Sequence, residues 1–194
     1  MNALEQRMAA RILLFEDDRA TGPETLKVRR LPSADKGGQW EVCGICDGIE
    51  PAAFRRIKVL LDAGKRQEAW EACLEYVWLD TRSVRSWIGS AAYPATEFFL
   101  RDHYFNSGGS NTVKILQRAL NDEGATPALA VDGIVGEATR TALRRLLQGN
   151  EKGFLSCLRD RRKAFYLACK QFPEFGRGWL RRTDEARDYA LTLC

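Results

Sequence analysis

The chain has 194 residues, of which 45% are hydrophobic, so it can bury a sizeable core and is not a disordered chain. Its length fits one domain or two small ones. Lysine and arginine number 30 against 26 acidic residues, and the excess lies in residues 106–194, where 15 basic residues stand against 10 acidic ones. This excess favours an anionic partner such as cell-wall polymer, but it is too sparse for the basic stripe of a nucleic-acid-binding protein. We therefore expect no nucleic acid among the partners.

The first residues show neither the basic nor the apolar region of a signal peptide, and no stretch approaches the length of a membrane span. We expect synthesis in the cytoplasm, a reducing compartment in which the six cysteines remain thiols. Cys43-Gly44-Ile45-Cys46 has the spacing of a redox or half-zinc site. A zinc site needs a second pair of ligands, however, and His103 is the only histidine. We therefore expect no metal and no cofactor.

Apolar residues recur at spacings of four, four and three from Leu4 to Phe15, which predicts a first helix that ends close to Glu16. The Glu16 carboxyl group would lie against an apolar wall, near the negative end of the helix dipole and beside Asp17 and Asp18. All three effects favour its protonated form, which glycoside hydrolysis requires of its general acid. The alternative is a solvated acidic cluster that ends a helix.

Two short runs rich in β-formers, residues 26–31 and 40–45, predict a β-hairpin with a glycine-containing loop of residues 32–38. A helix that carries an acid, followed by a small hairpin, is similar to the layout of lysozyme-like enzymes. From Pro51 onward the periodicity is helical, with breaks at residues 62–65 and at Tyr93-Pro94. We predict a mainly α fold, a lysozyme-like helical globule with one small β-hairpin.

Residues 98–143 contain two further patterns. Residues 98–109 predict a buried helix that ends at paired glycines, with His103 as a structural hydrogen-bonding residue. A helix over residues 111–121 then contains Leu-Gln-x-Ala-Leu, and the segment from Asp132 to Leu143 reads Asp-Gly-x-x-Gly-x-x-Thr-x-x-Ala-Leu. The glycines permit backbone geometry closed to other residues, and Asp132 can cap its own turn. The two halves in this order resemble peptidoglycan-binding helical modules.

Over residues 8–190 the sequence resembles glycoside hydrolase family 108. This family comprises N-acetylmuramidases whose catalytic region is fused to a peptidoglycan-binding type of helical module. Its catalytic glutamate follows an apolar helix and begins a Glu-Gly-Gly-Tyr motif, and Glu16 occupies the glutamate position here. The next family element, Gly-Gly-x-Thr-x-x-Gly-Ile, resembles residues 37–45, which are one residue longer. The family's Asn-x-Gly element resembles Asn106-Ser107-Gly108.

The end of the chain agrees with the same family. Residues 162–166 resemble its Arg-x-x-Phe-Tyr element, and residues 175–182 resemble its Phe-x-x-Gly-Trp-x-x-Arg element. The resemblance implies a peptidoglycan hydrolase of the N-acetylmuramidase or lysozyme type, bacterial or from a phage. It would cleave the glycan strands of the bacterial cell wall with Glu16 as general acid.

Two sets of further site residues follow. The resemblance implies that substrate is bound by Gln39, Trp40, Gly44 and Asn106. A second carboxylate is also needed, and the candidates are Glu41, Asp47, Asp18 and Asp17. Because the sequence does not fix their distances from Glu16, the retaining and inverting outcomes both stay open.

The chain departs from the family pattern at two places. Asp17-Asp18-Arg19 replaces Gly-Gly-Tyr, and Gln39 or Trp40 stands where the family has threonine. The alternative function is therefore a catalytically impaired relative that binds peptidoglycan or serves in secretion or phage assembly. We expect residues 1–105 to form the catalytic region and residues 106–194 the peptidoglycan-binding region of the same globule. Without a signal peptide, the protein would act in the periplasm or on the cell wall after holin-like or specialised export.

Overall fold

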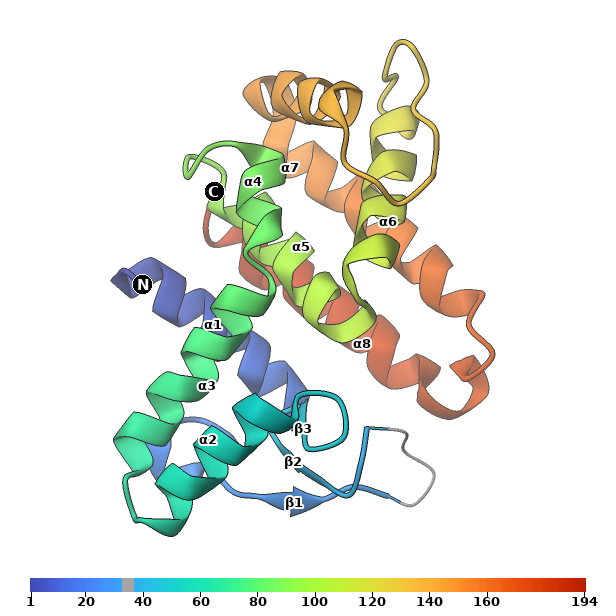
Figure 1. Cartoon of the computed structure of the whole chain (residues 1–194). Coiled ribbons are helices and arrows are strands. Elements are labelled where there is room, and N and C mark those ends of the chain that lie inside the picture. The colour runs from blue at the N-terminus through green and yellow to red at the C-terminus, as the bar shows by residue number, and fades with distance from the viewer. Residues whose placement is uncertain (33–36) are drawn as a thin grey trace. The chain divides into compact units, whose positions relative to one another are not determined.

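A computed structural model describes residues 1–32 and 37–194, and it confirms a mainly helical fold with one small sheet (Figure 1). The chain forms two compact units, Met1–Asp80 (unit 1) and Thr81–Cys194 (unit 2). The predicted division of function after residue 105 falls inside a helix of unit 2, so it is not a boundary between structural units. Residues 33–36 of the predicted hairpin loop lie outside the described residues. In the described part of the chain, none of the helices has the length and apolarity needed to cross a bilayer.

Unit 1 combines helices with the small sheet. Its helices are α1 (Ala3–Glu16), the short 3-10 helix η1 (Pro23–Thr25), α2 (Pro51–Asp62) and α3 (Arg66–Asp80). Its strands are β1 (Arg29–Arg30), β2 (Trp40–Val42) and β3 (Ile45–Cys46), which form an antiparallel sheet in the order β1-β2-β3. The predicted pairing of the two β-like runs is confirmed, since Arg29 lies opposite Glu41. The β2–β3 hairpin was not predicted, because the second run turns at residues 43–44 instead of continuing as one strand.

Helix α1 begins and ends where the sequence indicates. Asn2 caps it, because the Asn2 side chain accepts a hydrogen bond from the Glu5 backbone at 2.9 Å and the Glu5 carboxylate accepts one from the Asn2 backbone at 2.9 Å. Met8 and Ile12 on its apolar face are fully buried, and the helix packs against α3. This burial fixes the orientation of α1 and therefore the place where Glu16 leaves the helix.

Unit 2 consists of helices and the loops that join them. Its helices are α4 (Ser83–Ile88), α5 (Pro94–Ser107), α6 (Gly109–Asp122), α7 (Glu137–Leu167) and α8 (Phe172–Leu191). Helix α5 is buried on almost all sides and packs against α4, α6, α7 and α8. As predicted, it ends at the paired glycines, where Gly108 has a φ of 81°.

Charged side chains are buried along α5 together with the apolar ones. Asp102, fully buried, accepts hydrogen bonds from Arg162 at 2.6 Å and from Arg182 at 2.8 Å. Burial alone would raise the pKa of Asp102, but the two arginines outweigh it and hold that pKa below its usual value. His103 is buried and its Nδ1 lies 3.3 Å from the Tyr166 hydroxyl, as expected of a structural hydrogen-bonding residue. Burial lowers the pKa of His103 well below its usual value, so the ring is neutral at pH 7.

Candidate functional site

Glu16 is the last residue of α1 and is half-buried, so its side chain leaves the helix next to the core of unit 1. The preceding apolar residues on the buried face anchor the helix, which fixes the Glu16 backbone. The turn between β2 and β3 lies against this side chain. A Cβ atom built on Gly44 of that turn would lie 3.1 Å from Cγ and 3.2 Å from Oε2 of Glu16. The hairpin backbone therefore packs directly against this carboxyl group.

The β2–β3 turn needs unusual backbone geometry. Val42 pairs with Ile45, so only Cys43 and Gly44 connect the strands, and their φ angles are 49° and 79°. Two consecutive positive φ angles are typical of a type I′ hairpin turn, whose twist matches that of the strands. Gly44 satisfies the backbone requirement and also leaves room for Glu16, because any side chain there would press on the carboxyl group. Cys43 is a buried non-glycine residue held at positive φ, which is a strained conformation.

Asp17 has a structural role that the sequence did not reveal. It is buried, and its carboxylate accepts hydrogen bonds from Nε of Arg29 at 2.7 Å and from Nε of Arg19 at 3.0 Å. Burial alone would raise the pKa of Asp17, but the bonds from Arg29 and Arg19 outweigh it, so the pKa is lowered. The negative charge that the sequence places beside Glu16 at Asp17 is therefore paired with two arginines. Asp17 joins the end of α1 to β1.

Asp18 and Asp47 also have distinct surroundings. The Asp18 side chain is 94% exposed, and its nearest cationic partner is Nε of Arg19 at 3.8 Å. Asp47 instead accepts hydrogen bonds from the backbone N–H groups of Gln39 at 2.7 Å and Trp40 at 3.1 Å. It thus holds the start of β2, and both predicted substrate-binding residues beside it are exposed.

Glu41 lies on β2 between Trp40 and Val42 and is half-buried. Its cross-strand partners are Arg29 on β1 and Cys46 on β3. Its negative charge also helps to raise the pKa of the Arg19 guanidinium, after the larger effect of Asp17. Glu41 therefore belongs to the strand that leads into the turn over Glu16.

Asn106, the remaining predicted substrate-binding residue, lies in unit 2. Its Oδ1 accepts hydrogen bonds from the Tyr166 hydroxyl at 2.6 Å and from Ser107 at 3.1 Å. The ring of Tyr166 stacks on that of Trp179, with centroids 5.1 Å apart. The structure thus connects three of the segments that the family resemblance singled out, namely residues 106–108, 162–166 and 175–182.

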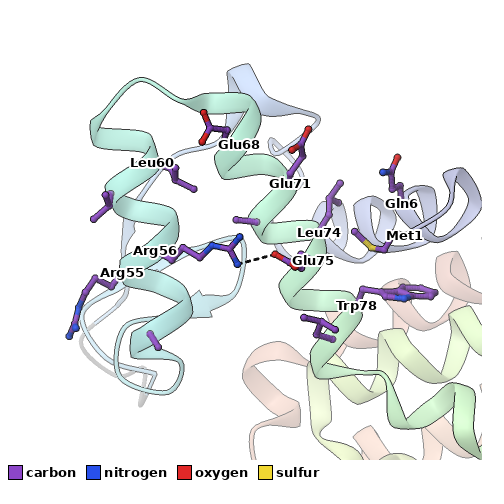
Figure 2. A pocket seen from close by; sticks show the side chains of 14 residues that line it. Met1, Gln6, Arg55, Arg56, Leu60, Glu68, Glu71, Leu74, Glu75 and Trp78 are labelled. Atoms are coloured by element: carbon purple, nitrogen blue, oxygen red, sulfur yellow. Dashed lines mark hydrogen bonds and ion pairs between the residues drawn. The ribbon is translucent and has the colours of Figure 1, made fainter.

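A hollow of about 1030 Å³ in unit 1 was not foreseen from the sequence (Figure 2). It lies between α2 and α3 and is crossed by a hydrogen bond of 2.9 Å from Arg56 to Glu75. Three of its lining residues, Met1, Val59 and Leu79, are exposed hydrophobic side chains. Neither Glu16 nor a candidate second carboxylate lines it, so this hollow is separate from the candidate acid.

The loop between α6 and α7 explains the motif of residues 111–143 in physical terms. Gln117 donates hydrogen bonds to the Asp132 carboxylate at 2.7 Å and to the Ile134 carbonyl at 3.0 Å, and it accepts one from the Gly133 N–H at 3.0 Å. The Asp132 carboxylate accepts from the Ile134 N–H at 2.9 Å, so it caps its own turn as predicted. At Gly133 φ is 80°, and a Cβ there would lie 2.5 Å from the Ser110 hydroxyl. The glutamine of the motif therefore holds the Asp-Gly turn against α6.

The segment that contains this loop also matches known proteins. Residues 111–184 match the model of a family described as "Predicted Peptidoglycan domain". Among solved structures, the chain is similar to SagA of Brucella abortus, with 20% sequence identity and a TM-score of 0.57 over 96% of this chain and 94% of that chain. No curated protein matches the sequence.

These comparisons confirm part of the predicted assignment. The peptidoglycan-domain match includes the Leu-Gln and Asp-Gly elements and lies entirely in unit 2. It does not reach Glu16, so the assignment to glycoside hydrolase family 108 rests on the motifs alone. At 20% identity, the likeness to SagA shows a shared fold.

In the residues that the structure describes, no three His, Cys, Asp or Glu side chains gather as they would to hold a metal ion. All six cysteines are free thiols, with Cys43 and Cys73 buried. Burial raises the pKa of Cys73 to about 12, so this thiol is a poor nucleophile at neutral pH. The Cys43-Gly44-Ile45-Cys46 spacing belongs to the hairpin turn, where Cys46 Sγ lies 3.4 Å from the Gly44 carbonyl.

Proposed function

We propose that the protein is a peptidoglycan hydrolase of the N-acetylmuramidase type in which Glu16 is the general acid. The observation that carries this proposal is the fixed position of Glu16, at the end of α1 and against the Gly44 turn, in a chain whose residues 111–184 match a peptidoglycan domain. The substrate is then the glycan strand of the cell wall, and the place of action is the wall or periplasm. No metal or cofactor takes part in this mechanism.

The proposed chemistry needs two carboxyl groups. Glu16 would give its proton to the leaving glycosidic oxygen as the bond between N-acetylmuramic acid and N-acetylglucosamine breaks. A second carboxylate would either attack the sugar carbon to form a covalent ester, which water then hydrolyses, or deprotonate a water that attacks the sugar carbon directly. In both routes water supplies the hydroxyl group of the new reducing end.

We assign the second carboxylate to Glu41. The Asp17 carboxylate joins α1 to β1, the Asp47 carboxylate holds the start of β2, and the Asp18 side chain extends into solvent. Glu41 lies on β2, the strand that runs directly into the turn packed against Glu16. A carboxylate on a paired strand also keeps a fixed position, which catalysis requires.

The test compares three proteins on purified peptidoglycan. Glu16→Gln keeps the size of the side chain but cannot supply the proton, so wall hydrolysis should fall by a factor on the order of 10² or more. Glu24→Gln is the control, because the Glu24 side chain is an exposed carboxylate of the same unit. Mass spectrometry of the products should show new reducing ends of N-acetylmuramic acid. Equal clearing by wild type and Glu16→Gln would refute the assignment of the acid.

A second function is favoured by the segment that follows Glu16. Asp17-Asp18-Arg19 stands where the family has Gly-Gly-Tyr, and the ion pairs of Asp17 hold this segment to β1. A protein so altered would bind peptidoglycan without cutting it. If wild-type protein sediments with peptidoglycan but releases no new reducing ends, this binding-only function replaces the hydrolase.

A further inference from the structure

A groove in unit 2 lies within the segment that matches the peptidoglycan domain. It has a volume of about 470 Å³, within the usual range for sites that bind small molecules or short peptide segments. One wall is the first half of α7, and the other is the end of α6 with the loop that follows it. At one end of the groove, Asn150 interrupts the helical geometry of α7, with φ of −156° and ψ of 70°.

The loop wall is fixed by a side chain behind it. Asn121 donates a hydrogen bond to the Leu129 carbonyl at 2.9 Å and accepts one from the Leu129 N–H at 2.7 Å. Gln117, one helical turn earlier, holds the Asp132-Gly133 turn of the same loop. Because the loop is bonded to α6 at two places, at Leu129 and at the Asp132-Gly133 turn, the groove is already formed before any ligand binds.

The surface of the groove is lined largely by aliphatic side chains. Leu120, Leu129 and Leu146 form its apolar lining, and the small residues Ala138 and Ala142 leave open space along α7. No aromatic ring is among the residues that line it in the described chain. Sugars in binding sites commonly stack on aromatic faces, whereas this lining suits methyl and methylene groups.

Charges of both signs stand at the rim. The Arg145 guanidinium is exposed, and of the two neighbouring arginines it is Arg144 that lies 3.8 Å from the Glu137 carboxylate. Glu123 and Glu137 are exposed on the groove as well. The groove therefore complements a short aliphatic chain that carries a carboxylate and an amine at separate points.

We propose that this groove binds the peptide branches of peptidoglycan and not its sugar strand. These branches combine alanine methyl groups, free carboxylates and, at the diamino acid, an amine. Arg145 would pair with a carboxylate, Glu123 or Glu137 with the amine, and the leucine and alanine lining with the alanine methyl groups. This inference rests on the peptidoglycan partner of the proposed function, but not on the hydrolase activity.

The test uses the full chain and the synthetic peptide L-Ala-γ-D-Glu-L-Lys-D-Ala-D-Ala as the probe, followed by two-dimensional NMR titration. Amide shifts should concentrate in residues 120–149. Arg145→Ala should weaken binding by about tenfold, as expected for the loss of a charge-assisted hydrogen bond. Arg118→Ala, an exposed arginine of α6 outside the groove, is the matched control and should leave binding unchanged.

A steric pair of variants tests the same site without changing charge. Ala138 is exposed on the groove, so Ala138→Leu should fill it and weaken peptide binding without disturbing the core. Gln148→Leu places the same side chain on an exposed position of α7 outside the groove and should have no effect. Thermal unfolding of each variant identifies any change that arises from misfolding.

The outcomes separate this inference from the proposed function. If the peptide shifts no groove residue, or if Arg145→Ala and Ala138→Leu both bind it like wild type, the groove is not a peptide site. Glycan strands stripped of peptide that shift the same residues would also overturn the inference in favour of the sugar. If the protein still sediments with whole peptidoglycan in either case, peptidoglycan remains its partner and only the peptide site is refuted. If it does not sediment, both the peptide site and the proposed function are refuted.

Discussion

Asp17→Ala tests whether the residue after the proposed acid is structural. The change removes the charge-assisted bond to Arg29, worth about 1.5–3 kcal/mol, and the contact with Arg19, whose side chain is 66% exposed. An exposed pair of that kind contributes about 0.2–1 kcal/mol. We therefore expect the free energy of unfolding to fall by about 2–4 kcal/mol. Asp18→Ala is the matched control, because its side chain is almost fully exposed, and its effect should stay within about 0.5 kcal/mol.

Urea unfolding at several pH values, followed by far-UV circular dichroism, measures both variants. The folded-state pKa of Asp17 is lowered, so its contribution to the free energy of unfolding is fully present above the unfolded-state pKa of about 3.9. That contribution is lost as the pH falls through the folded-state pKa. The difference in the free energy of unfolding between wild type and Asp17→Ala should thus be constant near neutral pH and become smaller below about pH 4. Equal unfolding midpoints for Asp17→Ala and Asp18→Ala at pH 7 would refute the structural role.

Three further results are expected. Gly44→Ala should reduce both stability and wall hydrolysis more than Gly64→Ala. Both glycines have positive φ, but only at Gly44 would a Cβ meet the side chain of the proposed acid, so activity and unfolding assays of the two variants separate backbone strain from this contact. Asp102→Asn should cost about 3–5 kcal/mol in urea unfolding, since it leaves two buried arginines without their carboxylate, whereas the exposed Asp160→Asn should be nearly silent. The pKa of His103 is lowered in the folded protein, so below pH 6.5 a proton binds the unfolded chain in preference to the folded one. The free energy of unfolding should therefore fall by up to about 1.4 kcal/mol per pH unit between pH 6 and 5. His103→Gln should remove this part of the pH dependence of stability.

The end of α1 illustrates what local patterns can predict. Apolar spacing placed the helix end at Glu16, and the β-forming runs gave the pairing of β1 with β2. Both features depend on side chains close in sequence or on simple alternation. The buried helix α5 and its end at the paired glycines were predictable for the same reason.

The surroundings of Glu16 were not predictable in the same way. The role of Asp17 was inferred from its position beside Glu16, but its partner Arg29 lies 12 residues away in the sequence and is brought to it by the fold. The Cys43-Gly44 turn was missed because cysteine rarely takes a positive φ, so the run was interpreted as one strand. Both features depend on contacts between residues that are distant in sequence or on a turn conformation that is rare for cysteine.

The resemblance of residues 111–143 to peptidoglycan-binding modules had no physical explanation until the loop geometry was known. Gln117 uses both its amide N–H and its carbonyl to bond one turn, and Asn121 does the same for Leu129. An amide side chain donates through its NH₂ group and accepts through its carbonyl oxygen, so each of these two side chains holds both a donor and an acceptor of the loop. The loop in that conformation forms one wall of the groove, so the recognisable motif supports this surface. The other residues that line the groove, including Arg145, form no recognisable motif in the sequence. The sequence motif thus identified the scaffold of the site, while the lining that would select a ligand emerged only from the fold.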